Sequence, residues 1–139
     1  MILLDTNVLS ALMRENPEPE VLQWLDQQPR MSIWTTSVTV FEIRFGLQIL
    51  PHGKRRSGLV HSFERLLEEL LQDRIVPFDG AAAQRTADEM AAQRRKGVPI
   101  ELRDAMIAGI ALASKATLAT RNVRHFRDFS IRLINPWER

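Results

Sequence analysis

The chain has no cysteine, few aromatic residues and no long apolar run. Without cysteine, disulfide bonds and thiolate metal sites are excluded, and the chain suits a reducing compartment. The three histidines, His52, His61 and His125, are far apart in sequence and form no pair at metal-ligand spacing. Any bound metal would therefore be a hard ion held by oxygen. No apolar run approaches membrane-spanning length and no charged leader precedes one, so we expect a cytoplasmic protein with no membrane partner.

The composition is that of an ordinary globular protein, with 45% apolar and 26% charged residues. A chain of 139 residues is long enough for one core, so we expect a single domain over residues 1–139. The formal net charge is only +2 despite a sequence pI near 9.7, which by itself does not indicate a nucleic-acid-binding protein. Positive charge is concentrated instead in local clusters, at residues 54–56, 94–96 and 121–127.

Short apolar segments alternate with helical patterns along the chain. Ile2-Leu3-Leu4 is an unbroken apolar run, which is typical of a strand buried on both faces of a parallel sheet. Further short strands are predicted at residues 32–35, 75–78, 117–120 and 132–134. This alternation predicts an α/β fold, a three-layer α/β/α sandwich around a central, mostly parallel sheet.

Two predicted helices suggest contacts beyond the core. The helix over residues 38–50 is apolar on nearly its whole circumference, and such a helix is buried on more than one side. We therefore predict a homodimer with Phe41, Phe45 and Ile49 near its interface. The helix over residues 55–72 is amphipathic, and its apolar face, which includes Leu59 and Phe63, could contribute to that interface or shelter another partner.

Acidic residues recur at equivalent places in the predicted fold. Asp5 follows the first strand, whereas Glu42 and Asp104 each begin an apolar helix. The polar residues Thr120 and Asn122 follow a later strand. In a parallel sheet these positions lie together at the carboxyl ends of the strands. Carboxylates that lie close together repel one another, and a bound cation would neutralise this repulsion. Mg²⁺ or Mn²⁺ suits such ligands and could support phosphodiester hydrolysis without histidine or cysteine.

Each of these acids also has a simpler interpretation. Asp5, Glu42 and Asp104 could be helix caps or surface acids, and only their joint pattern indicates a site. Glu101 is expected to be an exposed helix-start residue favoured by the helix dipole. His125 is expected to be structural or exposed rather than catalytic.

The same residues carry a resemblance to a known family. The chain resembles PIN-domain proteins, and most closely the VapC ribonuclease toxins and their FitB-like branch. The resemblance covers essentially the whole chain and depends on five motifs in order, Leu4-Asp5-Thr6-Asn7, Phe41-Glu42-Ile43-Arg44-Phe45-Gly46, Arg103-Asp104-Ala105-Met106-Ile107-Ala108, Leu118-Ala119-Thr120-Arg121-Asn122 and Leu133-Ile134-Asn135-Pro136-Trp137.

The resemblance implies a Mg²⁺- or Mn²⁺-dependent endoribonuclease held in check by a VapB-type antitoxin. Under it, Asp5, Glu42 and Asp104 are the catalytic, metal-binding acids, and the supporting residues are Thr6, Asn7, Thr120 and Asn122. The chain departs from the family at Asn122, where many PIN proteins have aspartate, and this puts a second metal ion in doubt. For an RNA substrate, we expect phosphate contacts from Arg94, Arg95 and Lys96, or from Arg121 and Arg124.

Three other readings compete with the nuclease. A phospho-acceptor signalling domain would need paired acids after the first strand, where this chain has Thr6-Asn7. A haloacid-dehalogenase-like phosphatase would need an aspartate at the position of Asn7. The third is a PIN-like binding or regulatory subunit with a weak or silent nuclease site, which Asn122 favours.

Overall fold

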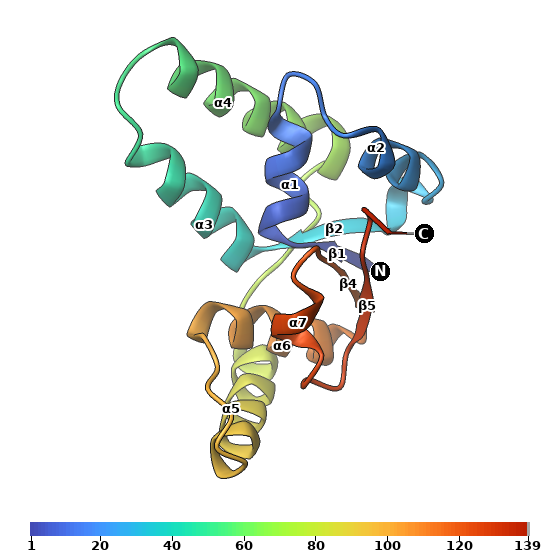
Figure 1. The fold of residues 1–139 in the computed structure, drawn as a ribbon, viewed down its shortest axis with the longest axis vertical. Helices are drawn as coiled ribbons and strands as arrows, with labels where there is room; N and C mark the ends of the chain where they lie inside the picture. Colours follow the sequence, from blue (N-terminus) through green and yellow to red (C-terminus); the bar gives the residue numbers. More distant parts are fainter. Residues whose placement is uncertain (139) are drawn as a thin grey trace.

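A five-stranded parallel sheet forms the centre of the computed structural model, which describes residues 1–138 (Figure 1). The strands are β1 (Ile2–Leu4), β2 (Ile33–Thr36), β3 (Ile75–Val76), β4 (Thr117–Ala119) and β5 (Arg132–Ile134). Their order across the sheet is β3-β2-β1-β4-β5, and every neighbouring pair is parallel. Strand β1 lies in the middle, with Leu3 opposite Trp34 on one side and Leu118 on the other.

Helices cover both faces of this sheet. The helices are α1 (Thr6–Met13), α2 (Pro19–Asp26), α3 (Ser37–Gln48), α4 (Lys54–Arg65), α5 (Gly80–Arg95), α6 (Leu102–Ser114) and α7 (Val123–Phe126). A 3₁₀ turn over Arg30–Ser32 precedes β2, and a π-helical segment over Leu66–Leu71 extends α4. Figure 1 shows α1 to α4 on one side of the sheet and α5 to α7 on the other.

The core divides into two apolar clusters, one on each face of the sheet. Leu4 packs on the side of α1 to α4, in a cluster that includes Val8, Leu9 and Phe63. Its neighbour Leu3 points the other way, into a cluster built largely by α6. Because successive side chains of a strand point to opposite faces, the apolar run of β1 contributes to both clusters. The predicted three-layer α/β/α sandwich is confirmed, and the sheet is entirely parallel in residues 1–138.

The sheet has a topological switch point at its centre. From β1 the chain proceeds outward through β2 to β3, and it then returns through α5 and α6 to place β4 on the opposite side of β1. Open parallel sheets bind ligands at such a point, beyond the carboxyl ends of the strands. Asp5 follows β1 and Thr120 follows β4, so both residues lie at this switch point.

The predicted elements agree with the structure apart from their ends and the segment after α4. The last strand begins and ends where predicted, and the helix predicted over residues 38–50 is α3, from Ser37 to Gln48. The helix predicted over residues 55–72 begins one residue earlier, at Lys54, changes from α-helix to π-helix at Leu66 and ends at Leu71, and its C-cap Gln72 has a left-handed φ of 47°. Within residues 1–138, no helix is both long and apolar enough to cross a membrane.

Candidate active site

Asp5 is the most enclosed acid of the site. It is the N-cap of α1, and its Oδ1 accepts a hydrogen bond of 2.8 Å from the Thr6 backbone N–H. Its Oδ2 accepts hydrogen bonds from the Thr120 hydroxyl at 2.7 Å and from Asn7 Nδ2 at 3.2 Å. Only 4% of its surface is exposed, and burial raises its pKa above the ordinary value, although the Thr120 hydrogen bond opposes this rise. Groups that follow β1 and β4 therefore hold the Asp5 carboxylate in one orientation, and the surrounding fold shields it from solvent.

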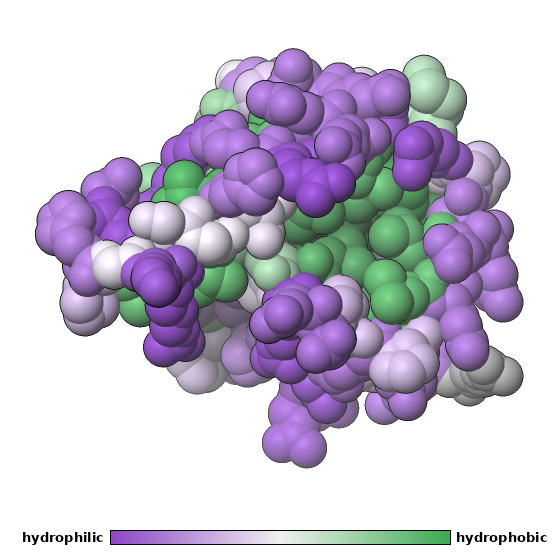
Figure 2. All heavy atoms as spheres, turned by 90° about the horizontal axis from the view of Figure 1, so that it is seen from above, coloured by the Kyte–Doolittle hydropathy of each residue, from purple (hydrophilic) through white to green (hydrophobic). Residues whose placement is uncertain are grey.

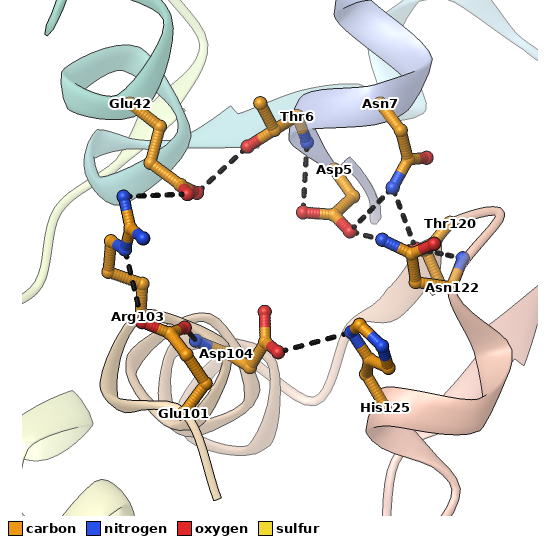
Figure 3. A network of polar contacts seen from close by, with 10 residues as sticks. All are labelled: Asp5, Thr6, Asn7, Glu42, Glu101, Arg103, Asp104, Thr120, Asn122 and His125. Carbon is orange, nitrogen blue, oxygen red and sulfur yellow. Dashed lines mark hydrogen bonds and ion pairs between the residues drawn. The ribbon is translucent and has the colours of Figure 1, made fainter.

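Glu42 reaches the same region from the first turns of α3 (Figure 3). Thr36, the N-cap of α3, accepts a hydrogen bond from the backbone N–H of Thr39, and this cap fixes where the helix begins. The Thr6 hydroxyl donates to Glu42 Oε1 at 2.9 Å, while Arg103 Nη1 lies 3.6 Å from Glu42 Oε2. Desolvation raises the pKa of Glu42, and the charge of Asp5 adds to the rise.

Asp104 enters from the opposite wall, in the first turn of α6. The N-cap of this helix is Glu101, whose Oε2 accepts a hydrogen bond of 3.0 Å from the Asp104 backbone N–H. Burial raises the pKa of Asp104 from 3.8 to about 6, and the negative charges of Glu101, Asp5 and Glu42 contribute to this rise. Asp104 thus lies close enough to the other acids for their charges to oppose its own ionisation.

The hydroxyl and amide side chains of the site join strand ends that are distant in sequence. Asn7 Nδ2 donates to Thr120 Oγ1 at 3.3 Å, and Asn7 Oδ1 accepts the Arg121 backbone N–H at 2.9 Å. The Asn122 backbone N–H donates to Thr120 Oγ1 at 3.0 Å, which holds the turn after β4 against Asp5. Asn122 therefore lies at the predicted place, on the rim of the cleft.

Together these residues form an open cleft of about 410 Å³ at the switch point of the sheet. Twelve residues line it, Asp5, Thr6, Asn7, Ser10, Ala11, Arg14, Glu18, Glu42, Asp104, Arg121, Asn122 and Trp137. The three predicted metal-binding acids do share this cleft. Within residues 1–138, however, no three histidine, aspartate or glutamate side chains are positioned to bind the same metal ion. Each carboxylate is instead satisfied by a protein group, as Figure 3 shows.

Two residues of the site were not predicted. Arg103 places its Nε 3.1 Å from Glu101 Oε1 and so bridges that acid to Glu42. His125 Nδ1 lies 3.4 Å from Asp104 Oδ2, with an exposed ring. The motif around Asp104 includes Arg103, but no sequence pattern relates it to Glu42, 61 positions away. Glu101 behaves as predicted, as an exposed helix-start residue, and also forms part of the charged network.

The predicted basic residues separate into two groups. Arg121 lines the acidic cleft, and both Arg121 and Arg124 line a neighbouring hollow of about 530 Å³ that also contains Arg127. Residues 94–96 lie instead at the carboxyl end of α5, which Figure 1 shows extending away from the sheet and α7. Of the predicted RNA-binding residues, only Arg121 therefore lines the acid cleft, and Arg124 lies in the hollow beside it.

The sequence profile of the PIN domain matches residues 2–131 of this chain. The chain belongs to the PIN-domain family. It is 39% identical to the VapC ribonuclease Y4jK of Sinorhizobium fredii and 34% identical to the toxin FitB of Neisseria gonorrhoeae, in each case over 99% of both chains. It is also 39% identical to the plasmid stability protein StbB of Pseudomonas syringae pv. tomato, over 99% of both chains.

Solved structures agree with this assignment. The chain superimposes on a chain of the crystal structure of FitAcB from Neisseria gonorrhoeae with a TM-score of 0.90 and 34% identity over the whole of both chains. It superimposes on DNA-bound VapBC from Salmonella typhimurium with a TM-score of 0.79 and 26% identity over 97% of both chains. The predicted resemblance to the VapC toxins and their FitB-like branch is confirmed.

Proposed function

We propose that this PIN-domain protein is a divalent-metal-dependent endoribonuclease that acts in the cytoplasm as the toxin of a toxin–antitoxin pair. The observation that carries the proposal is the meeting of Asp5, Glu42 and Asp104 in one cleft, where burial raises the pKa of all three and the charge of Asp5 adds to the rise at Glu42 and Asp104. The names of the relatives, a VapC ribonuclease and a FitB toxin, support the same activity.

By chemical type, the donors of the cleft suit Mg²⁺ or Mn²⁺, and Asp5, Glu42 and Asp104 would have to move closer together than they lie in the structure to bind one ion. Carboxylate and hydroxyl oxygens are hard ligands, and the excess of negative charge around Asp104 is what a bound cation would relieve. Asp5, Glu42 and Asp104 would hold the ion. When bound, it would act as a Lewis acid toward the scissile phosphate and lower the pKa of the attacking water.

Neighbouring side chains orient these acids and offset their charge. Thr120 and Asn7 fix one oxygen of Asp5, and Thr6 fixes one oxygen of Glu42. Arg103 offsets the charge of Glu42 at 3.6 Å. Such partners hold catalytic carboxylates in one orientation, as hydrogen bonds around metal ligands generally do. Asn122 adds no charge, so we infer that one ion binds firmly and a second binds weakly.

The RNA chain would pass from the acid cleft over the basic hollow beside it. Arg121, Arg124 and Arg127 line that hollow, and Arg124 and Arg127 would contact phosphates on one side of the cut. Binding should weaken as salt rises, because each phosphate contact on a single strand adds about 0.7 to the slope of log affinity against log salt concentration. Replacing Arg124 and Arg127 with glutamine should lower this slope by about 1.4, whereas the same change at Arg94 and Arg95 should leave it unchanged.

An antitoxin is the proposed protein partner. Solved neighbours include the FitAcB and VapBC complexes, and Figure 2 shows a face on which apolar side chains lie in a hollow bordered by polar ones. On the α1–α4 side of the sheet, a cavity of about 280 Å³ combines apolar with polar and charged side chains in its lining, Leu12, Leu66 and Leu70 with Arg30, His61, Ser62, Arg65 and Glu69. An antitoxin segment with an apolar face fits this surface, because helices commonly dock in such grooves.

A homodimer through α3 is also part of the proposal. Phe41, Phe45 and Ile49 are 57%, 52% and 68% exposed, and the two phenylalanine rings stack with centroids 6.1 Å apart. These residues recur at a spacing of four and so form one stripe along the helix. An exposed stripe of large apolar residues marks an interaction surface.

The decisive experiment is RNA cleavage by purified, antitoxin-free protein across a titration of Mn²⁺ and Mg²⁺. Asp5→Asn and Glu42→Gln should each reduce cleavage by about 100-fold or more and leave the circular dichroism spectrum unchanged. Glu64→Gln is the matched control, because Glu64 also pairs with an arginine, at 2.8 Å, but lies outside the cleft. Full cleavage by both cleft variants, or cleavage without a divalent ion, would contradict the proposal.

A silent, binding-only PIN subunit is the second candidate. It is favoured by Asn122 and by carboxylates that already have protein partners. In the same assay, antitoxin-free protein that binds RNA but yields no metal-dependent cleavage would support this candidate.

A further inference from the structure

The end of the chain forms one wall of the acid cleft. After β5, residues 135–137 turn back so that Trp137 lines the cleft with Asp5 and Asp104. The indole Nε1–H donates a hydrogen bond of 2.9 Å to Glu18 Oε2, and the Trp137 backbone N–H donates to Asn135 Oδ1 at 3.0 Å. The position of the indole ring is thus fixed from two directions.

Arg121 makes a cation–π contact with this ring, because its guanidinium carbon lies over the ring, 4.8 Å from the centroid. Its backbone N–H is held by Asn7 at 2.9 Å, so the residue is tied to the start of α1 as well. Within residues 1–138, no carboxylate pairs with Arg121, although four acids line the same cleft. A planar, unpaired cation is therefore held by an aromatic ring between the acid cleft and the basic hollow.

We propose that Arg121 and Trp137 form a stacking platform for the base of a nucleotide that flanks the scissile phosphate. Single-stranded RNA is recognised by stacking of splayed bases on aromatic rings and on arginine guanidinium planes. The acids of the cleft repel phosphates, whereas stacking adds affinity that does not depend on backbone charge. This inference rests on the proposed ribonuclease function and assigns a base-contacting role within it.

A pure phosphate contact would need a different arrangement. A phosphate contact requires positive charge and hydrogen-bond donors, and it gives no reason to place the guanidinium over an indole. A stacked base instead requires the flat face of the guanidinium. Arg121→Lys keeps the charge but removes both this face and the paired donors that can bind a phosphate, so RNAs that lack one base are needed to separate the two roles.

The test is binding of a fluorescein-labelled, short single-stranded RNA in EDTA, where no cleavage occurs. Arg121→Lys and Arg121→Gln should weaken binding alike, by about 5- to 150-fold, the range that loss of one stacked base produces. Arg85→Lys is the matched control and should bind like the parent, because Arg85 is exposed on α5 and lines neither the acid cleft nor the basic hollow. Trp137→Phe should lose less affinity than Trp137→Ala, because phenylalanine keeps a ring.

RNAs that carry one abasic residue, moved position by position, then locate the stacked base. At one position the abasic RNA should bind the parent weakly and show no further loss with Arg121→Lys. Parent-like binding by Arg121→Lys would overturn the platform and leave a phosphate contact. A penalty that persists with every abasic RNA would also overturn it, and melting temperatures would then show whether Trp137 is only a structural clamp.

The experiments test the stacking platform and the proposed nuclease activity independently. Normal Mn²⁺-dependent cleavage with no base dependence at Arg121 would overturn the platform alone. Base-dependent binding without cleavage would overturn the nuclease and leave the platform standing. A parent protein that binds no RNA would overturn the platform, whatever the cleavage assay shows.

Discussion

Asp104 should make the metal-free protein less stable at neutral pH. Its pKa is raised from 3.8 to about 6, so the folded state holds the Asp104 proton more tightly than the unfolded state does. Stability is therefore lost as pH rises through the window from about 4 to about 6, and the full cost applies above it. Asp104→Asn removes the titrating group and should remove this cost.

The magnitude follows from the size of the shift. A rise from 3.8 to about 6 corresponds to about 3 kcal/mol at ~1.4 kcal/mol per pKa unit. Because Asp104 is only half-buried, solvent screening reduces this to about 1–2 kcal/mol. The variant also loses a favourable charge at the start of α6, worth about 0.3–1 kcal/mol. We expect a net gain of about 1 kcal/mol, or about 3–5 °C in melting temperature.

Thermal unfolding in EDTA, followed by circular dichroism near pH 4, 6 and 7.5, measures this effect. The variant should melt higher than the parent at the highest pH and equally at the lowest. Asp26→Asn is the control, because Asp26 is exposed at the end of α2, and its substitution should change the melting temperature by about a degree or less. A variant that melts lower near pH 7.5, or a gain that does not depend on pH, would refute the reasoning. The variant should also lose cleavage, which would make Asp104 a residue kept for activity at a cost in stability.

Three further predictions concern the metal, the dimer and the core. Asn122→Asp should lower the metal-free melting temperature and raise the gain on adding Mn²⁺, and identical metal-dependent shifts would place Asn122 outside the metal site. The parent should be a dimer by light scattering at micromolar concentration, and serine at both Phe41 and Phe45 should make it a monomer with an unchanged fold. Gly109→Ala should cost about 1–3 kcal/mol in urea unfolding, because its Cβ would lie 1.9 Å from Thr86 Oγ1. Thr86→Ala should restore part of this loss, and an unaltered midpoint for Gly109→Ala would contradict the close packing of α5 on α6.

Local sequence patterns were enough to predict the fold class and the acids that meet in the cleft. Ile2-Leu3-Leu4 is apolar at every position because β1 is buried on both faces, and that local signal is sufficient to predict a central parallel strand. Asp5 follows it as the cap of α1, whereas Glu42 lies in the second turn of α3 and Asp104 in the first turn of α6. Because parallel strands all end at one edge of the sheet, these local signals were enough to predict that the acids share a cleft.

The partners of each acid depend on how elements that are distant in sequence pack together. Arg103 meets Glu42 and His125 meets Asp104 only because α3, α6 and α7 converge on the switch point, and no spacing along the chain encodes these pairs. The positions of the basic residues could not be predicted from the sequence either. Arg121 and Arg94 both belong to basic clusters, but Arg121 lines the cleft and Arg94 lies at the far end of α5. Sequence patterns report which face of an element is apolar, whereas contacts between polar side chains depend on how distant elements pack. The Arg121–Trp137 stack joins the turn after β4 to the end of the chain, so it too was visible only in the folded structure.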